Sequence, residues 1–525
     1  MVIHDNTTWM KRLALLCLTV LAASDLCVAG ASKPNVLLLF ADQHNADVMG
    51  CSGHPIIKTP NLDQLAAKGV RFSRAYCQDA ICVPSRTALM TGLYPRTTGC
   101  LDNGDAPVSQ TKLHPLQQVF QSAGYLTGCF GKRHLPRPTL AAGWDRSATV
   151  ISPKQDPSDE NYDDWIKTRE PGQAEAFEKD RKGSLQSDMC CHISEVKPEN
   201  RIEAYAALKT KEFLRECQRQ GKPFFCWASF HGPHQPYTPP AKWAALYPVA
   251  GMPLPASVNE PIDHLPPGLQ NWRRNTRDPW CLAKAAEDPN LYRQYIAYYF
   301  AQVTEVDHFI GEVLAELDAL GLRDNTIVIY AADHGDFVAR HGMIEKCAVS
   351  HNVYEETLRV PLIVSWPGRF QEGAICESLT LLVDLYPTLL ELVQLPRPAD
   401  APKLAGRSLV PTLTRGTPTG RPYAISENWS QVSVITDRYK LGVWIDPTSR
   451  YAQRDFRKKF PDMLFDREKD PQELVNLLGK PDYAAVESQL RAHLADWVGR
   501  IPDDGKKAVS SLPAETKTKN RKTNQ

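Results

Sequence analysis

The architecture of this chain follows from the stretch Asn35-Val36-Leu37-Leu38-Leu39-Phe40, which a single alanine separates from Asp42 and Gln43. A continuous apolar run of this length is typical of a strand buried on both faces of a sheet. Similar runs occupy residues 223–230, 326–331 and 360–365, and helical patterns at 61–68, 116–123, 202–218 and 291–320 lie between them. This alternation predicts an α/β domain with a large, mostly parallel sheet flanked by helices.

Polar side chains directly follow the apolar runs. These positions are the carboxyl ends of the predicted parallel strands, where such sheets bind ligands. Asp42 and Gln43 follow the first run, and Asp333-His334-Gly335-Asp336 follows the run at 326–331. Taken alone, Asp42 is equally a loop carboxylate that caps a helix. Two acid-bearing strand ends in one sheet can instead face a single divalent cation. Carboxylate and amide oxygens favour calcium or magnesium, whereas the imidazole of His334 suits manganese or zinc better.

The segment Cys82-Val83-Pro84-Ser85-Arg86 predicts the start of a helix, because proline is favoured in the first helical turn. Arg86 would then lie one turn beyond Cys82, at a helix end whose free amide hydrogens and dipole stabilise an anion. The alternative is a buried structural cysteine beside an exposed arginine.

Three further segments carry candidate catalytic side chains. Lys132 and His134 alternate after the strand pattern at 125–130, so an extended backbone would project both to one side. His234 lies between two prolines in a stiff loop, which suits a positioned proton donor. The alternative for each is a solvated loop or a hydrogen-bonded turn without a catalytic role. Lys346 taken by itself would be interpreted as a surface lysine.

In this order, the segments resemble the sulfatase family of the alkaline-phosphatase superfamily. The resemblance runs from residue 35 to about residue 478. It also includes the segments at 59–63, 354–364, 384–388, 406–409 and 464–471. It implies an alkaline-phosphatase-like fold and an enzyme that hydrolyses sulfate esters, a sulfuric ester hydrolase.

Residue by residue, the resemblance implies that Cys82 is oxidised to formylglycine by a formylglycine-generating or sulfatase-maturating enzyme. One calcium ion would be held by Asp42, Gln43, Asp333, His334 and the modified Cys82, with magnesium or manganese as alternatives. The implied catalytic residues are Cys82, Arg86, Lys132, His134, His234 and Lys346. One hydroxyl of the aldehyde hydrate would attack sulfur, His234 would protonate the departing alcohol, and the second hydroxyl would allow sulfate to be expelled.

Three positions depart from the family pattern. Many relatives have two acids where this chain has Asp42 and Gln43, and an asparagine where it has His334. The family often has tryptophan at the position of Arg133, between the paired lysine and histidine. That extra charge would either touch an anionic substrate or face solvent.

The two ends of the chain and its composition indicate its domain organisation and its location. A basic stretch, an apolar core and Ala29-Gly30-Ala31 predict a signal peptide over residues 1–31 and export to the periplasm or the medium. We expect a catalytic domain at 32–410, a C-terminal subdomain with an antiparallel sheet and a helix at 411–502, and a disordered tail at 503–525. A net charge of +1 gives no support for nucleic-acid binding, and no segment is long and apolar enough for stable membrane insertion.

Fourteen cysteines minus Cys17 and Cys27 in the signal leave twelve, and removing Cys82 leaves an odd eleven. An oxidising destination permits disulfides, with Cys190 and Cys191 as candidates, but at least one thiol should stay free.

The substrate is expected to be a sulfated carbohydrate, because export and two aperiodic insertions at 150–200 and 235–290 favour a large extracellular substrate. Residues that could stack on and pair with such a sugar, or simply pack the insertion onto the body, are Trp272, Arg273, Arg274, Arg277 and Trp280. Two rival functions are a phosphonate monoester or phosphodiester hydrolase of the same superfamily, and a non-catalytic protein that binds sulfated glycans.

Overall fold

A computed structural model describes residues 33–105, 112–136, 140–150, 159–184, 186–276, 280–346, 352–429, 431–445 and 456–501. The expected signal peptide and the expected C-terminal tail lie outside these residues.

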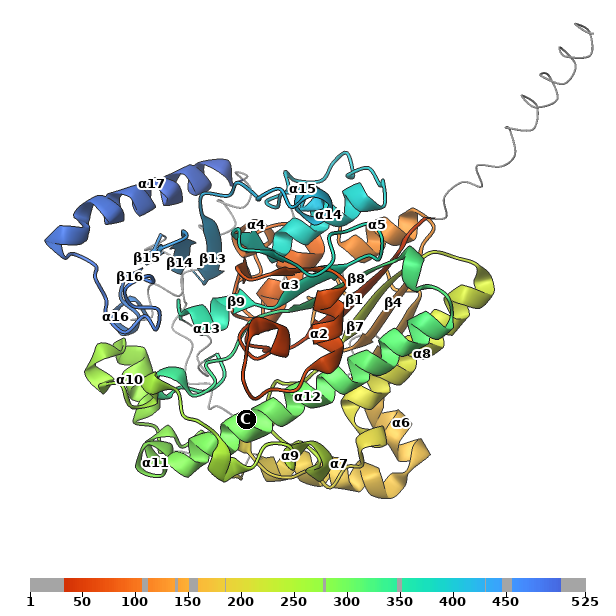
Figure 1. Ribbon diagram of the computed structural model, residues 1–525, viewed down its shortest axis with the longest axis horizontal. Coiled ribbons are helices and arrows are strands. Elements are labelled where there is room, and N and C mark those ends of the chain that lie inside the picture. The colour runs from red at the N-terminus through yellow and green to blue at the C-terminus, as the bar shows by residue number, and fades with distance from the viewer. Residues whose placement is uncertain are drawn as a thin grey trace, which may run out of the picture.

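A nine-stranded sheet forms the centre of the molecule, with the strand order β11-β2-β10-β8-β1-β7-β4-β5-β6 (Figure 1). The strands are β1 (Asn35–Ala41), β2 (Val70–Phe72), β4 (Leu126–Gly131), β5 (Arg146–Thr149), β6 (Glu160–Asn161), β7 (Phe224–Ser229), β8 (Thr326–Ala332), β10 (Leu362–Ser365) and β11 (Ala374–Cys376). Only β10 runs against its neighbours β8 and β2. The sheet is therefore mostly parallel, as the sequence predicts.

The apolar run of β1 is continuous because both faces of the sheet are covered. Leu37 and Leu39 belong to one hydrophobic core, and Val36 and Leu38 belong to another on the opposite face. Successive side chains of a strand point to opposite faces, so a strand between two cores needs apolar residues at every position. Every residue of β1 is buried.

Helices cover both faces (Figure 1). The helices α2 (Pro60–Ala67), α8 (Ile202–Gln220) and α12 (Pro289–Ala319) contribute Leu62, Leu214 and Ile310 to the first core. The second core takes Phe120, Leu389 and Leu413 from α5 (Leu116–Ser122), α14 (Leu385–Leu392) and α15 (Val410–Arg415). A further helix, α3 (Cys82–Thr91), is buried along its whole length.

The C-terminal part contains a four-stranded antiparallel sheet. It consists of β13 (Ala424–Asn428), β14 (Gln431–Ile435), β15 (Tyr439–Trp444) and β16 (Met463–Asp466), and α17 (Ala484–Arg500) packs against it. The alternating runs at 423–426, 432–436 and 439–444 and the helical pattern at 483–498 predict three of these strands and the helix, whereas β16 was not predicted as a strand. The core under this sheet includes Tyr76 and Leu358, so it is continuous with the main body of the fold.

The two insertions are more regular than their composition suggests. The first holds β6, α6 (Tyr162–Arg169) and α7 (Pro171–Ser184), and it extends the main sheet by its edge strand. The second holds α9 (Ala241–Ala244), α10 (Pro267–Arg273) and α11 (Leu282–Glu287). Both pack onto the first core through buried residues such as Tyr162, Ile166 and Leu269. The remaining elements are β3 (Ala75–Tyr76), β9 (Arg359–Val360), β12 (Thr380–Leu381), α4 (Pro95–Thr98), α13 (Glu355–Leu358) and α16 (Phe456–Lys459).

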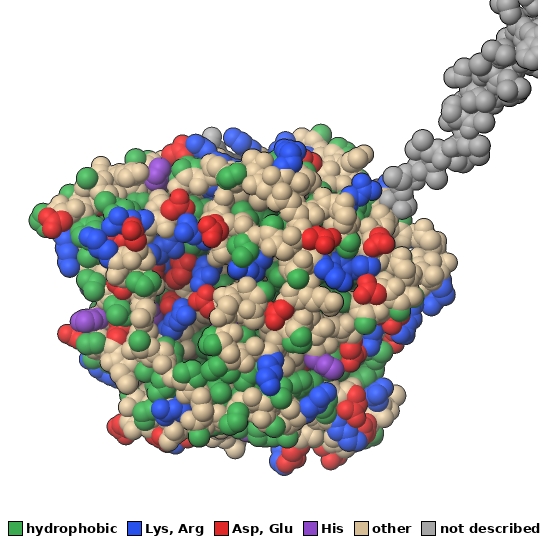
Figure 2. Space-filling model, in the orientation of Figure 1, with side chains coloured by type: hydrophobic (Ala, Val, Ile, Leu, Met, Phe, Trp, Pro, Cys, Tyr) green, Lys and Arg blue, Asp and Glu red, His purple; other side chains and the backbone are tan. Residues whose placement is uncertain are grey.

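On the surface, acidic and basic side chains are intermixed over the face shown in Figure 2, in line with the net charge of +1. No helix in the described ranges is long and apolar enough to cross a membrane. None of the eleven cysteines in those ranges forms a disulfide, so Cys190 and Cys191 are not bridged there.

Candidate active site

Four strand ends lie at one level of the sheet and carry the polar residues of the site. Ala41 of β1 pairs with Ala332 of β8, so Asp42 and Asp333 follow side by side. Gly131 of β4 pairs with Ser229 of β7. The carboxyl ends of neighbouring parallel strands meet at one edge, which is where such folds bind ligands.

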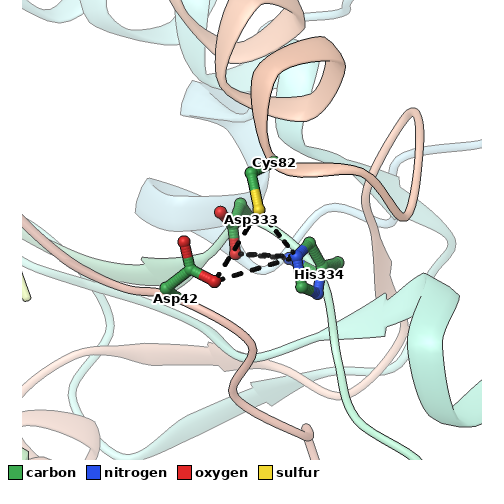
Figure 3. A group of neighbouring side chains, drawn as sticks. All are labelled: Asp42, Cys82, Asp333 and His334. Carbon is green, nitrogen blue, oxygen red and sulfur yellow. Dashed lines mark hydrogen bonds and ion pairs between the residues drawn. The ribbon is translucent and has the colours of Figure 1, made fainter. Parts of the chain in front are cut away.

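The thiol of Cys82 reaches this edge from the first residue of α3. Its Sγ lies 3.3 Å from Nε2 of His334 and 3.9 Å from Oδ1 of Asp42. One ligand atom each from Asp42, Cys82, Asp333 and His334 lies within 4.8 Å of the others. In Figure 3 the two carboxylates, the thiol and the imidazole point toward one another.

Arg86, one turn further along α3, is fully buried and ties the strand ends together. Its guanidinium donates to Oδ2 of Asp333 at 2.7 Å and to Oδ2 of Asp42 at 2.9 Å. It also donates to the backbone oxygen of Lys132 at 2.6 Å and to Oγ of Ser229 at 2.9 Å. Only a planar guanidinium presents donors in several fixed directions at once.

Two lysines from segments far apart in the sequence contribute positive charge to the site. The Nζ of Lys132 lies 2.6 Å from Oδ2 of Asp42. The Nζ of Lys346 donates to Oε1 of Gln43 at 3.2 Å. Lys346 taken by itself would be interpreted as a surface lysine, but it is buried with only 6% of its surface exposed.

His234 completes the cluster from the loop after β7. Its Nδ1–H donates to the backbone oxygen of Gln235 at 2.8 Å, and its Nε2 lies 3.8 Å from Oδ1 of Asp42. The backbone bond selects the tautomer, so Nε2 faces the site.

Burial and the surrounding charges compete in setting the protonation states. Burial alone would raise the pKa of Asp42, but Lys132, His234, Arg86 and His334 outweigh it and hold the pKa well below its usual value. Burial and Asp42 would raise the pKa of the Cys82 thiol, yet Lys132, Lys346 and His334 bring it well below the ordinary value. The cations therefore favour anionic groups at both positions.

The donor set fits a divalent cation. Each acid keeps one oxygen away from Arg86: Oδ1 of Asp42, and Oδ1 of Asp333, which lies 3.8 Å from Nε2 of His334. His334 donates its Nδ1–H to the oxygen of Gly335 at 3.0 Å, which leaves the lone pair of Nε2 directed at these oxygens. Despite burial, Asp333 raises the pKa of His334, so the carboxylates attract a positive charge to this point.

Two predictions around Lys132 need correction. The extended backbone ends at Gly131, and His134 has a φ of 46°, so Lys132 and His134 do not project together from one strand. The half-buried His134 makes no hydrogen bond or ion pair with the other site residues among the described ranges, and its buried Nδ1 has no partner there. Arg133 does not face solvent, because it is buried against Asp159 in a two-bond ion pair with contacts of 2.6 and 3.3 Å.

The aromatic and basic residues of the second insertion favour the packing interpretation. Trp272 and Trp280 are partly buried against the first core. Arg273 donates to the backbone oxygen of Glu260 at 2.8 Å, Arg274 is exposed, and Arg277 lies outside the described residues.

Sequence reasoning missed the residues that orient Gln43. Its Nε2 donates to Oδ2 of Asp336 at 2.9 Å and to Oη of Tyr237 at 3.1 Å. Tyr295 donates to the other oxygen of Asp336. Asp336 belongs to the segment after β8 and could have been found there, whereas no local pattern marks the two tyrosines.

Comparisons with known proteins agree with this geometry. A family model described as Sulfatase matches residues 34–395, and a model described as N-sulphoglucosamine sulphohydrolase, C-terminal, matches residues 340–499. An arylsulfatase of Clostridium perfringens is 28% identical, with 92% of this chain and 99% of that protein covered. A Delta 4,5-hexuronate-2-O-sulfatase of Bacteroides thetaiotaomicron is 29% identical, with 91% and 92% covered. The crystal structure of a phosphonate monoester hydrolase of Agrobacterium radiobacter shares the fold at a TM-score of 0.73 and 23% identity, covering 90% of this chain and 96% of that one.

Proposed function

The chain belongs to the sulfatase family of the alkaline-phosphatase superfamily and is a sulfuric ester hydrolase, and from this premise we propose that it desulfates a sulfated carbohydrate through formylglycine formed from Cys82. The observation that carries the proposal is the convergence of Asp42, Arg86, Lys132 and Lys346 around the Cys82 side chain.

The cationic side chains bind and orient the sulfo group. A sulfate ester resists nucleophilic attack because its oxygens are negative and shield the sulfur. Lys132 and Lys346 offer positive charge near Cys82, and Arg86 holds both acids in place. Fixed charges in a buried site stabilise the developing negative charge without reorganisation.

We assign the proton transfer to His234. Its Nδ1–H is engaged by Gln235, so the group that reaches a leaving oxygen is Nε2. Burial and Lys132 lower the pKa of His234 to about 4 in the free protein. The negative charge of a bound sulfo group would favour the protonated ring, which then donates its Nε2 proton to the alcohol as the sulfur–oxygen bond breaks.

Two groups complete the proposed chemistry. Formylglycine at position 82 would supply a hydrate with two hydroxyls, one to attack sulfur and one to allow release of sulfate. A calcium ion, with magnesium or manganese as alternatives, would be held by Asp42, Gln43, Asp333 and His334 and would supply further charge against the sulfo oxygens. The modification requires a formylglycine-generating or sulfatase-maturating enzyme, and we expect the protein to be exported.

The carbohydrate assignment rests on the similarity to the hexuronate sulfatase, whose name specifies a sugar. The rival assignment as a phosphonate monoester or phosphodiester hydrolase is favoured by the fold similarity to the Agrobacterium enzyme. The pairs Asp42-Gln43 and Asp333-His334 suit either reaction.

Mass spectrometry of the tryptic peptide Ala75–Arg86 tests the modification, because conversion of the thiol to an aldehyde lowers its mass. Sulfate release from defined sulfated oligosaccharides is then compared with hydrolysis of a phosphonate monoester and a phosphodiester by the same preparation, with Cys82→Ala as the control. If the protein carries formylglycine but hydrolyses the phosphonate monoester or the phosphodiester faster than the sulfate esters, the sulfatase assignment is contradicted. An unconverted protein that binds sulfated glycans would favour the non-catalytic alternative.

A further inference from the structure

A pocket of about 230 Å³ lies beside α17 and has four cationic side chains in its lining and no acidic one. The four are Lys403, Arg407, Arg421 and Arg500. We call it the α17 pocket. We propose that it is a second, non-catalytic site that binds a sulfo group of a sulfated saccharide. This proposal rests on the proposed function, because that function supplies the anionic substrate.

The charge of the pocket is only partly compensated. Arg421 pairs with Asp384 and Arg500 pairs with Asp496 from outside the lining. Lys403 and Arg407 are exposed and make no ion pair with any described residue. Three other pockets bounded by described residues contain both signs of charge, so a cationic lining is not a general property of this surface. An anion in the α17 pocket would meet two uncompensated cations.

Unused hydrogen-bond donors point to the same kind of ligand. The Nε of Arg421 and the Nε1 of Trp497 are buried, and neither has a hydrogen-bond partner in the described part of the chain. Both residues line the pocket. Both atoms are donors only, and an unmade hydrogen bond on a buried donor is unfavourable. The missing partner is therefore an acceptor. A sulfo group offers several acceptor oxygens together with negative charge, and because both atoms are shielded from solvent, its binding requires the side chains of the lining to move apart.

The α17 pocket is separate from the catalytic cluster. Its lining comes from the segments 93–97, 403–407, 421–423 and 497–501. The catalytic side chains instead follow β1, β4, β7 and β8 or lie on α3. A volume of about 230 Å³ accommodates one sulfated sugar residue rather than a long chain. A polymer held at both places would gain avidity, since the second contact becomes intramolecular.

The test uses full-length Cys82→Ala protein, which binds without turning over, and a heparin-derived hexasaccharide as the probe. Calorimetry gives the stoichiometry, and hydrogen–deuterium exchange locates protection. We expect two sites, with protection of residues 403–409 and 490–501. The double variant Lys403→Ala/Arg407→Ala should lose that protection and weaken the second site at least about tenfold, the loss expected when two charge-assisted contacts go.

The matched control is Lys68→Ala/Arg219→Ala, which removes two exposed cations elsewhere and should leave both sites unchanged. Equal weakening by the two double variants would overturn the proposal in favour of non-specific charge attraction. Equal protection by inorganic sulfate, or by the desulfated hexasaccharide, would overturn the assignment to a sulfated saccharide.

Failure of this proposal is distinguishable from failure of the proposed function. In the Cys82 background, Lys403→Ala/Arg407→Ala should hydrolyse nitrophenyl sulfate at the rate of the unaltered protein, which also shows that it is folded. If the unaltered, converted protein releases no sulfate from any ester, the catalytic assignment fails whatever the α17 pocket binds.

Discussion

The Nδ1 of His234 donates to the backbone oxygen of Gln235 at 2.8 Å, so the orientation of the ring depends on the loop backbone. Two helices hold that loop. Oε1 of Glu203 on α8 accepts from the nitrogen of Gly232 at 3.1 Å, and Nε2 of Gln302 on α12 donates to the oxygen of Pro236 at 2.8 Å. Glu203 and Gln302 are therefore positioning residues for His234.

Glu203→Ala should lower kcat/KM for alkyl sulfates by roughly 10- to 100-fold, because a displaced His234 cannot reach the leaving oxygen. Nitrophenyl sulfate should be much less affected, since its leaving group needs little protonation. Glu203→Gln keeps an acceptor for Gly232 and should recover most of the activity. The exposed Glu212→Ala on the same helix is the control. A loss independent of the leaving group would indicate a general structural defect instead.

Removing the guanidinium of Arg86 should destabilise the fold as well as the site. Arg86→Ala leaves Asp42 and Asp333 buried without their partner, and breaking a buried ion pair in this way costs about 3–5 kcal/mol. Arg86→Lys keeps one charge but cannot satisfy four acceptors, so we expect a folded protein with kcat reduced about 100-fold. Urea unfolding and steady-state rates measure the two effects. An unchanged unfolding midpoint for Arg86→Ala would contradict the bridging role.

Chelation should remove both activity and stability. A cation that binds only the folded chain stabilises it by about 2.7 kcal/mol when its free concentration is 100 times its Kd. Dialysis against EDTA should therefore lower Tm and sulfate release, and calcium should restore both. Adding magnesium or manganese separately shows how well each ion restores Tm and sulfate release compared with calcium. In Asp333→Asn, chelation should no longer move Tm. Insensitivity of the unaltered protein to EDTA would exclude the proposed metal site.

Arg133 should matter for stability and not for substrate binding. Arg133→Ala removes the guanidinium that compensates the buried charge of Asp159 and should cost about 3–5 kcal/mol. Because Arg133 is buried in this pair, KM for sulfate esters should stay unchanged. The double variant Arg133→Ala/Asp159→Ala removes both charges and should regain part of the stability. A rise in KM without loss of stability would instead support contact with the substrate.

Glu355 should make the fold sensitive to acid. Burial would raise the pKa of its carboxyl, but Arg467, Lys440 and Arg359 lower it from 4.5 to about 2. A depressed pKa contributes stability that is present above pH 4.5 and is lost as the pH falls toward about 2. Glu355→Gln should therefore cost about 3 kcal/mol at pH 7, and progressively less as the pH falls below 4.5.

Urea unfolding of Glu355→Gln and the unaltered protein at pH 7, 5.5 and 4 gives this comparison. Glu195→Gln, which removes an exposed ion pair with Lys179, is the control and should cost little at any pH. If the loss of stability of Glu355→Gln relative to the unaltered protein grew as the pH falls, the stabilising role of the Glu355 carboxylate would be contradicted.

Local patterns identified the strands β1, β4, β7, β8 and β10 of the main sheet and part of the site, but not β2, β5, β6 and β11. The run ending at Phe40 is apolar at every position because both faces of β1 are covered, and a pattern of that kind can be read without knowing its neighbours. Asp42 and Asp333 were found for the same reason, since each directly follows such a strand. The same reasoning failed for the insertions and for β16, where short elements carry little periodicity.

By itself, the sequence determined that strands alternate with helices and that acids, a cysteine and an arginine follow their ends. Only the tertiary structure decided which of these groups meet: Lys346 is buried against Gln43, and Arg133 turns away to Asp159. The physical reason is that burial and charge pairing depend on strand order and register, which bring together residues as distant as Gln43 and Lys346. No local pattern in the chain encodes those contacts.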